Sequence, residues 1–531
     1  MGNMAERILL RGGEVIDGSG SPAFKADLLI EGDRIADVGL NISNESSRAI
    51  DCSGKTITPG FIDMHSHSDL KLFVDPQIPQ KIRQGVTTEV LGQDGISVAP
   101  VLSDRRLSRR AALAGLLGDP RIEWRWNSIG EYLSALDGKT ATNVMTLIPH
   151  GAVRDCVIGP DDRPATESEV KEMVKLVEKS LVEGAAGIST GLIYPPCCYG
   201  TKEELIELCR PVAAAGRFFV VHMRSESDFI ERGLEEVMDI SRASGVHLHV
   251  SHVKIAGRNN WSKLNDIVAQ MERFVDSGGK LSCDQYPYLA GSTLLSAVLP
   301  PWVHSGGVEK ALERLSSKTL RQKMREEMLE TGPCEWDNFY KFSGPEGIFI
   351  TDAKLDEHRS CIGRNLSDLG AEYNAEPIEF AFDFLQKEKM AGSMVAFSQC
   401  EEVVQRFLRM PFTSICTDGL LGAKPHPRVY GAFPRVLGRY ARELNTITFT
   451  DAVHRMTGLA ASLLGLSDRG LVRAGMKADL VVLDPRTVID KATYEEPAQF
   501  PVGIDSVFVN GHPAFENRTQ SNSFSGRALR N

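Results

Sequence analysis

Residues 56–67 decide the fold: they read TITPGFIDMHSH, an apolar run that ends in a cluster of polar side chains. Side chains two positions apart on a strand point the same way, so His65 and His67 lie on one side and can share a metal ion. An apolar strand that ends in metal-ligating residues is typical of an active site at the mouth of a barrel. Further strands of this kind follow along the chain.

Strand-like and helical patterns alternate through the middle of the chain. Eight apolar runs occupy residues 56–67, 86–91, 143–150, 185–190, 217–223, 246–252, 281–286 and 413–418. Helical stretches between them include residues 167–183, 202–215, 230–244 and 261–277. Such alternation indicates βα units and a parallel sheet. Eight units over this length predict an α/β fold, a TIM-like (β/α)8 barrel.

The two ends of the chain have a different pattern. Short alternating runs separated by tight turns fill residues 1–55, and the same pattern returns around the turn at Asn510-Gly511. Such runs favour antiparallel hairpins. We therefore predict a small β-sandwich domain built from residues 1–55 and 466–531, around a barrel at residues 56–465.

The longest interval in the alternation separates the seventh and eighth runs. Residues 305–330 within this interval are strongly helical and charged. The interval therefore predicts an inserted helical subdomain at about residues 300–345.

Several of the predicted strands end in residues that bind metals. The fifth run closes with His222, the sixth with His252 and the eighth with Asp418. The carboxyl ends of all strands meet at one face of such a barrel. A lone histidine at a strand end is usually a hydrogen-bonded core residue, but several histidines and an aspartate on one face indicate a metal centre. The sequence predicts that these side chains converge with His65 and His67.

Six blocks of sequence, in order, carry a family resemblance. They are PGFIDMHSH at 59–67, GISTGLIY at 187–194, HMRSE at 222–226, SHVK at 251–254, DQYPY at 284–288, and the segment from Asp418-Gly419 to His426-Pro427-Arg428. In these blocks the chain resembles the amidohydrolase superfamily, and within it the D-aminoacylase (N-acyl-D-amino-acid deacylase) family. The histidine pair alone recurs throughout the superfamily, whereas the ordered set covers nearly the whole chain. The resemblance implies a metal-dependent hydrolase that converts an N-acyl-D-amino acid into a carboxylate and a free D-amino acid.

The resemblance also implies a divalent metal centre. It assigns Asp94, His222 and His252 to the tighter site, and His65, His67 and Asp418 to a second one. The family usually carries a cysteine in the loop after the second strand, where this chain has Asp94. A carboxylate is a harder ligand than a thiolate and can bridge two ions, so we expect one or two Zn²⁺ ions, with Mn²⁺ as an alternative.

The same set of residues suggests how an amide is hydrolysed. A divalent ion can lower the pKa of water from about 15.7 to about 7. Asp418, with an ordinary pKa of about 3.9, starts ionised. We expect it to take a proton from that water and pass it to the departing amine, as the catalytic residue.

Binding the free carboxylate of an N-acyl amino acid requires cations. Lys254 lies two residues beyond His252 and so on the same face, and Arg428 offers a fork that suits a bidentate carboxylate. By resemblance, Tyr194 adds a hydroxyl donor. When these residues hold the carboxylate and the metal holds the carbonyl, the side chain of the substrate can point in only one direction, which selects the D enantiomer. Residues 285–300 contain no cation, so we expect a hydrophobic or broad side-chain preference.

Two other functions fit parts of the sequence. Cyclic-amide hydrolases of the hydantoinase or dihydroorotase kind, and dipeptidases that act on isoaspartyl or D-amino-acid-containing substrates, generally bridge two metals with a carboxylated lysine after strand four. Residues 183–194 contain no lysine, although Asp94 could fill that place. A non-catalytic scaffold with the same fold is the third reading, but scaffolds normally lose metal ligands that this chain retains.

Composition bounds the partners and the compartment. Of 531 residues, 42% are hydrophobic and 24% charged, which is typical of a globular protein. A net charge of −10 predicts no nucleic-acid partner. We see neither a membrane span nor a signal peptide, and ten cysteines without regular spacing suit a reducing compartment. We expect a cytoplasmic enzyme with a small-molecule substrate and no membrane partner. The sequence leaves the oligomeric state open, with a homo-oligomer as one alternative.

Overall fold

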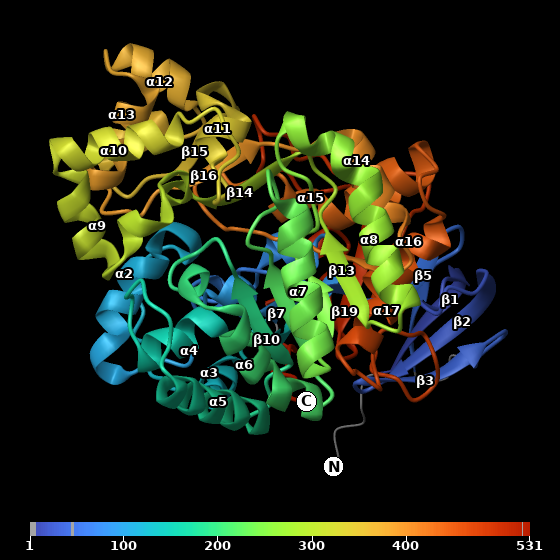
Figure 1. The fold of residues 1–531 in the computed structure, drawn as a ribbon. Coiled ribbons are helices and arrows are strands. Elements are labelled where there is room, and N and C mark those ends of the chain that lie inside the picture. Colours follow the sequence, from blue (N-terminus) through green and yellow to red (C-terminus); the bar gives the residue numbers. More distant parts are fainter. Residues whose placement is uncertain (1–6, 44–46, 523) are drawn as a thin grey trace.

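The computed structural model describes all residues except 1–6, 44–46 and 523. The described residues form a (β/α)8 barrel at the centre of the molecule, which confirms the predicted fold class (Figure 1). Its strands are β6 (Phe61–Asp63), β7 (Val86–Leu91), β8 (Asn143–Thr146) with β9 (Ile148–Pro149), β10 (Gly187–Gly191), β11 (Phe218–His222), β12 (His247–Val250), β13 (Leu281–Gln285) and β17 (Thr413–Ile415).

The barrel closes between its first and eighth strands. Neighbouring strands pair in parallel, in the order β6-β7-β8 and β9-β10-β11-β12-β13-β17. A parallel bridge joins Ser66 to Gly419, and the Asp418 N–H donates to the His65 carbonyl at 2.8 Å. Because all strands run the same way, their carboxyl ends share one mouth. Closure also brings His65, which follows the first strand, next to Asp418, which follows the eighth.

Helices cover the outside of the barrel. They include α1 (Pro79–Ile82), α2 (Arg106–Leu117), α3 (Ile129–Leu136), α4 (His150–Val157), α5 (Glu167–Val182), α6 (Lys202–Ala214), α7 (Ile230–Ser244), α8 (Leu264–Asp276), α14 (Glu401–Arg409), α15 (Arg428–Arg435), α16 (Phe449–Met456) and α17 (Gly458–Leu463). Helix α5 begins at Glu167 because Thr166 and Glu169 form a reciprocal capping box. Helix α7 ends at Ser244 because Gly245, which follows it, adopts a left-handed conformation with φ of 78°. No helix in the described part of the chain is both long and apolar enough to cross a membrane.

Both ends of the chain contribute to one curled sheet beside the barrel, where blue and red segments lie together in Figure 1. Its nine described strands are β1 (Arg7–Val15), β2 (Phe24–Glu31), β3 (Arg34–Gly39), β4 (Arg48–Asp51), β5 (Thr56–Pro59), β18 (Leu480–Leu483), β19 (Ile504–Val509), β20 (His512–Glu516) and β21 (Thr519–Gln520). Strand β5 joins the two halves, because it pairs with β1 on one side and with β18 on the other. A separate apolar core fills the inside of this curl. The single predicted run at 56–67 is thus two strands, β5 in this sheet and β6 in the barrel.

A subdomain with its own apolar core is inserted between β13 and β17. It contains α9 (Gly307–Leu315), α10 (Lys318–Met328), α11 (Phe339–Ser343), α12 (Leu366–Glu372) and α13 (Pro377–Lys387). These helices pack on an antiparallel sheet of β14 (Ala290–Leu294), β16 (Ser393–Phe397) and β15 (Ile348–Asp352). The insertion therefore extends over 290–397, beyond the helical stretch that the sequence indicates. It stands over one side of the barrel mouth (Figure 1).

Candidate active site

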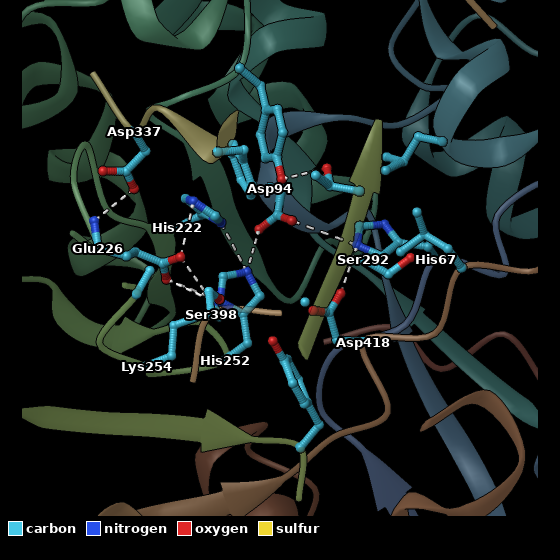
Figure 2. Close-up of a pocket in the computed structure, with 18 of the residues that line it drawn as sticks. His67, Asp94, His222, Glu226, His252, Lys254, Ser292, Asp337, Ser398 and Asp418 are labelled. Atoms are coloured by element: carbon cyan, nitrogen blue, oxygen red, sulfur yellow. Dashed lines mark hydrogen bonds and ion pairs between the residues drawn. The ribbon is translucent and has the colours of Figure 1, made fainter. Parts of the chain in front are cut away.

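The barrel mouth brings together the six residues that the sequence assigns to a metal centre, and Figure 2 shows most of them around one small cavity. His65, His67 and Asp418 form one group. The Nε2 atoms of the two histidines lie 3.3 Å apart, and Asp418 Oδ1 lies 3.6 Å from the first and 3.3 Å from the second. All three side chains are buried. This group is built where the first and eighth strands meet.

Asp94 lies between this group and the next histidine. Its Oδ2 is 3.5 Å from His65 Nε2 and 3.6 Å from His67 Nε2, and its Oδ1 is 3.7 Å from His252 Nε2. The carboxylate reaches this position because the chain turns sharply after β7, with φ of 76° at Gly92 and 54° at Asp94 itself. A carboxylate that faces three imidazoles from two sides can bridge two metal ions.

A third group comes from β11 and β12. His222 Nδ1 lies 3.0 Å from His252 Nε2. Glu226 Oε2 lies 3.4 Å from His222 Nε2, and its Oε1 lies 3.3 Å from His252 Nδ1. Among the described residues, His222 is thus grouped with His252 and Glu226, whereas the resemblance grouped it with His252 and Asp94.

The chemistry of these groups fits a divalent cation. The potential ligand atoms within each of the three groups lie within 4.8 Å of one another. Asp94 Oδ1 is buried and has no hydrogen-bond partner among the described residues. Burial lowers the pKa of His67, but Asp418 and Asp94 outweigh it and raise the pKa to about 9. The cluster therefore favours positive charge at its centre, which a metal ion supplies.

Buried polar contacts hold the ligand-bearing loops. The backbone N–H of His252 donates to Asp284 Oδ1 at 2.7 Å, while His249 Nε2 lies 2.8 Å from Asp284 Oδ2. On the opposite side Asp63 accepts the Thr417 backbone N–H at 2.8 Å, next to Asp418. These contacts are needed because the backbone is strained: φ is 31° at His252 and 46° at Asp418. Such left-handed conformations of residues other than glycine concentrate at functional sites.

Lys254 lies in the site but is already paired. Its Nζ is 2.8 Å from each oxygen of Glu226 and 2.6 Å from His252 Nδ1. Burial raises the pKa of Glu226, but His222 and Lys254 outweigh it and lower the pKa to about 2. The lysine thus neutralises a carboxylate of the site.

Arg428 lies next to the predicted catalytic residue. Its side chain is fully buried, with Nη1 2.8 Å from Asp418 Oδ2, and Nη2 donates to the Ser292 carbonyl at 3.0 Å. Burial raises the pKa of Asp418, but Arg428 and His65 outweigh it, so this pKa lies well below its ordinary value. Asp418 is therefore ionised at neutral pH. The Nε atom of Arg428 has no hydrogen-bond partner among the described residues, and its Nη1 atom contacts Asp418 as an ion pair.

Tyr194, in the loop after β10, contributes a hydroxyl group at another edge of the site. Its hydroxyl lies 2.8 Å from Thr293 Oγ1, and its ring packs 5.2 Å from the ring of His222, centre to centre. The side chain lines the cavity at the metal ligands and also the larger cleft beside it.

Two buried acids of the site were not predicted. Glu226 follows His222 by four residues, inside a block that carries the family resemblance, and this spacing is a signal that could have identified it. Asp337 comes from the insertion and accepts hydrogen bonds from the Ser225 hydroxyl at 2.9 Å and from the Glu226 backbone N–H at 2.8 Å. The sequence holds no comparable signal for Asp337, because only the tertiary structure places it beside the β11–α7 loop.

The fold and this ligand set define an amidohydrolase: the chain matches the model of the amidohydrolase family over residues 48–321 and 355–515 and belongs to that family. Within it, the chain is a member of the D-aminoacylase group, which confirms the resemblance seen in the sequence. It is 36% identical over 524 residues to the D-aminoacylase of Alcaligenes xylosoxydans xylosoxydans, covering 98% of this chain and 97% of that protein.

Solved structures agree with this membership. A crystal structure of N-acyl-D-glutamate deacylase from Bordetella bronchiseptica, complexed with zinc and a phosphonate inhibitor, superposes with a TM-score of 0.84 at 32% identity and covers all of both chains. A D-aminoacylase structure that addresses the role of a binuclear metal centre superposes with a TM-score of 0.82 at 35% identity over 99% of both chains.

Proposed function

We propose that this protein is a zinc-dependent N-acyl-D-amino-acid deacylase, which hydrolyses the linear amide bond to release a carboxylic acid and a free D-amino acid. One observation carries the proposal: Asp418 lies within 3.6 Å of two histidines that can bind a metal and 2.8 Å from a buried arginine. The two metal-binding histidines, the proposed proton carrier Asp418 and the proposed anion-binding Arg428 thus lie next to one another. The similarity to a D-aminoacylase and to a zinc-bound deacylase supports the same activity.

The residues that would hold one or two zinc ions are the three overlapping groups of the site. A bound divalent ion polarises the scissile carbonyl and lowers the pKa of water. Asp94, Glu226 and Asp418 are the acids among these potential ligands. Because carboxylate oxygens also suit Mn²⁺, we propose Mn²⁺ as the alternative metal.

Asp418 is proposed as the catalytic residue. It is ionised in the described structure, so it can accept the proton of the attacking water. Its Oδ1 faces the metal ligands, while its Oδ2 is held by Arg428. The oxygen that faces the ligands can therefore carry the proton to the departing amine without a change of side-chain position.

Arg428, Lys254 and Tyr194 are proposed to bind the substrate. The guanidinium of Arg428, whose Nε has no hydrogen-bond partner among the described residues, suits the α-carboxylate. Lys254 and Tyr194 border the cavity at the metal ligands, whereas Arg428 is fully buried beside Asp418, which borders it. With the carboxylate bound at one side and the carbonyl at the ligand cluster, only one enantiomer directs its side chain into free space. The cavity is also lined by Leu116, Ala256, Phe339 and Phe342, which supports a hydrophobic or broad side-chain preference.

We further propose that the enzyme works in the cytoplasm on small molecules, without nucleic-acid or membrane partners. The net charge of −10 supports this, as do the free cysteines among the described residues. The sequence is compatible with a homo-oligomer. Light scattering of the purified protein measures its mass in solution and so determines the oligomeric state.

A panel of N-acetyl-D- and N-acetyl-L-amino acids tests the proposed function. Each pair is assayed with zinc, with manganese and after removal of metal by a chelator. We expect hydrolysis of D substrates alone, loss of activity on chelation and recovery with metal. Hydrolysis of hydantoins or dihydroorotate in place of the linear amides would overturn the proposal.

A further inference from the structure

The space at the metal ligands is too small for the whole substrate. The cavity bordered by His67, Asp94 and His222 has a volume of about 30 Å³, which is room for about two waters. A cleft of about 1390 Å³ lies beside it, larger than the roughly 300–1000 Å³ of an ordinary ligand pocket. The two spaces share Tyr194, Asp337 and Phe339 in their walls, so the cleft adjoins the site along these side chains.

The geometry of the barrel decides which part of the substrate points into this cleft. Asp418 must lie near the leaving amine, and it follows β17. Tyr194 follows β10, which stands on the other side of the ring of strands from β17. The amino-acid part therefore lies toward Asp418 and Arg428, and the acyl group extends past Tyr194 into the cleft. In this orientation Tyr194 contacts the acyl side of the substrate, and not the α-carboxylate as the sequence suggested.

Residues of α2, beside the barrel, and of α9, in the insertion, line the cleft. These two helices are in contact (Figure 1). Apolar side chains from both sides line it: Leu107 and Ala111 of α2, Ile193 of the β10 loop, and Leu299, Val308 and Leu312 of the insertion. Leu107 is 83% exposed, so most of its apolar surface is open to solvent.

Three of the arginines in the walls already have partners. Arg110 binds Asp119 at 2.5 Å, Arg224 binds Glu236 at 3.0 Å, and the guanidinium of Arg109 donates to the Ser97 carbonyl. They therefore offer little to an anionic ligand, and the surface left for contact is mainly apolar.

We propose that this cleft binds a long apolar acyl chain, so that N-acyl-D-amino acids with extended fatty acyl groups are better substrates than N-acetyl ones. The inference rests on the proposed function and names its substrate class. Each methylene that becomes buried contributes about 0.8 kcal/mol, or about fourfold in kcat/KM. Four additional methylenes along the cleft, from butanoyl to octanoyl, should raise kcat/KM on the order of 100-fold.

A chain-length series on one amino acid tests this. N-acetyl-, N-butanoyl-, N-octanoyl- and N-dodecanoyl-D-alanine are compared below their micellar concentrations. A second series keeps the acetyl group and lengthens the side chain, from D-alanine to D-norleucine. We expect kcat/KM to rise steeply in the first series and much less in the second. A rise confined to the second series would overturn the inference, because the cleft would then hold the side chain.

Two variants connect the effect to the cleft. Leu107→Asp and Leu312→Asp each place a charge on its wall, and both should lower the octanoyl-to-acetyl ratio of kcat/KM at least tenfold. Leu107 is exposed, so its replacement costs little in folding even if Leu312→Asp fails to fold. Val182→Asp, at a 90% exposed position that ends α5, is the control and should leave the ratio unchanged.

The outcomes separate the two proposals. Activity on N-acetyl-D-alanine without a chain-length trend, or a trend that Leu107→Asp does not alter, overturns the acyl cleft and leaves the deacylase intact. Absence of activity on every N-acyl-D-amino acid overturns the proposed function and the acyl cleft together.

Discussion

Replacing Arg428 with alanine separates two roles that the structure gives to one side chain. The guanidinium pairs with Asp418 through Nη1 at 2.8 Å, and its Nε donor has no hydrogen-bond partner among the described residues. If the guanidinium binds the substrate carboxylate, the variant loses a charge-assisted contact worth about 1.5–3 kcal/mol, which is roughly 10- to 150-fold in affinity. It also leaves Asp418 without its buried partner, which slows turnover of every substrate.

The assay therefore compares N-acetyl-D-leucine with its neutral carboxamide, both followed as released primary amine. We expect Arg428→Ala to lower kcat/KM for both, with an additional rise in KM of roughly 10- to 150-fold for the acid alone. Arg428→Lys should fall between, because an ammonium keeps the charge without the fork. Metal content measured on each variant excludes loss of the centre. Equal losses on acid and carboxamide would refute the carboxylate clamp and leave Arg428 as a positioning residue for Asp418.

Three further predictions follow from the site. Asp418→Asn should lower kcat at least about 100-fold with metal content unchanged, since it removes the proton carrier; near-normal turnover would exclude that role. Asp94→Cys should increase the retention of Zn²⁺ over Mn²⁺ in metal analysis after dialysis, because a thiolate is the softer ligand, and an unchanged ratio would contradict Asp94 as a ligand. Burial raises the pKa of Asp337 from 3.8 to about 6. The folded state thus holds this proton more tightly than the unfolded chain does, so ionisation of the carboxyl costs up to about 3 kcal/mol of stability as the pH rises from about 4 to 6. Asp337→Asn removes that titration, so the Tm of wild type relative to the variant should fall over this range, whereas a constant difference contradicts the raised pKa.

The barrel could be predicted because local and tertiary preferences agree along it. Helix 230–244 was expected from its apolar period and is α7 over the same residues, and helix 167–183 is α5, which ends one residue earlier. The run at 56–67 was wrong as a single strand, because the chain leaves the terminal sheet after β5 and enters the barrel at β6. Gly60 joins these two strands, and a Cβ there would lie 2.2 Å from the Thr87 side chain. Apolar periodicity does not reveal such a crossing.

The insertion was less predictable, because its sheet is formed by distant segments. Strands β14 and β16 pair with each other although they lie at opposite ends of the insertion, and β15 joins them from between two helical regions. Each is only five residues long and interrupts helical sequence. Helical periodicity at 305–330 correctly indicated α9 and α10 but carried no signal of the sheet on which they pack.

The extent of the insertion matters for chemistry because it reaches the metal ligands through a chain of buried contacts. Asp337 holds the backbone of Glu226, Glu226 pairs with Lys254, and Lys254 contacts His252. The same insertion forms one wall of the acyl cleft. Movement of that wall by a bound acyl chain would therefore act on Glu226 through Asp337. A long acyl group is then expected to change kcat as well as KM, since the cleft and the ligand cluster share one set of hydrogen bonds.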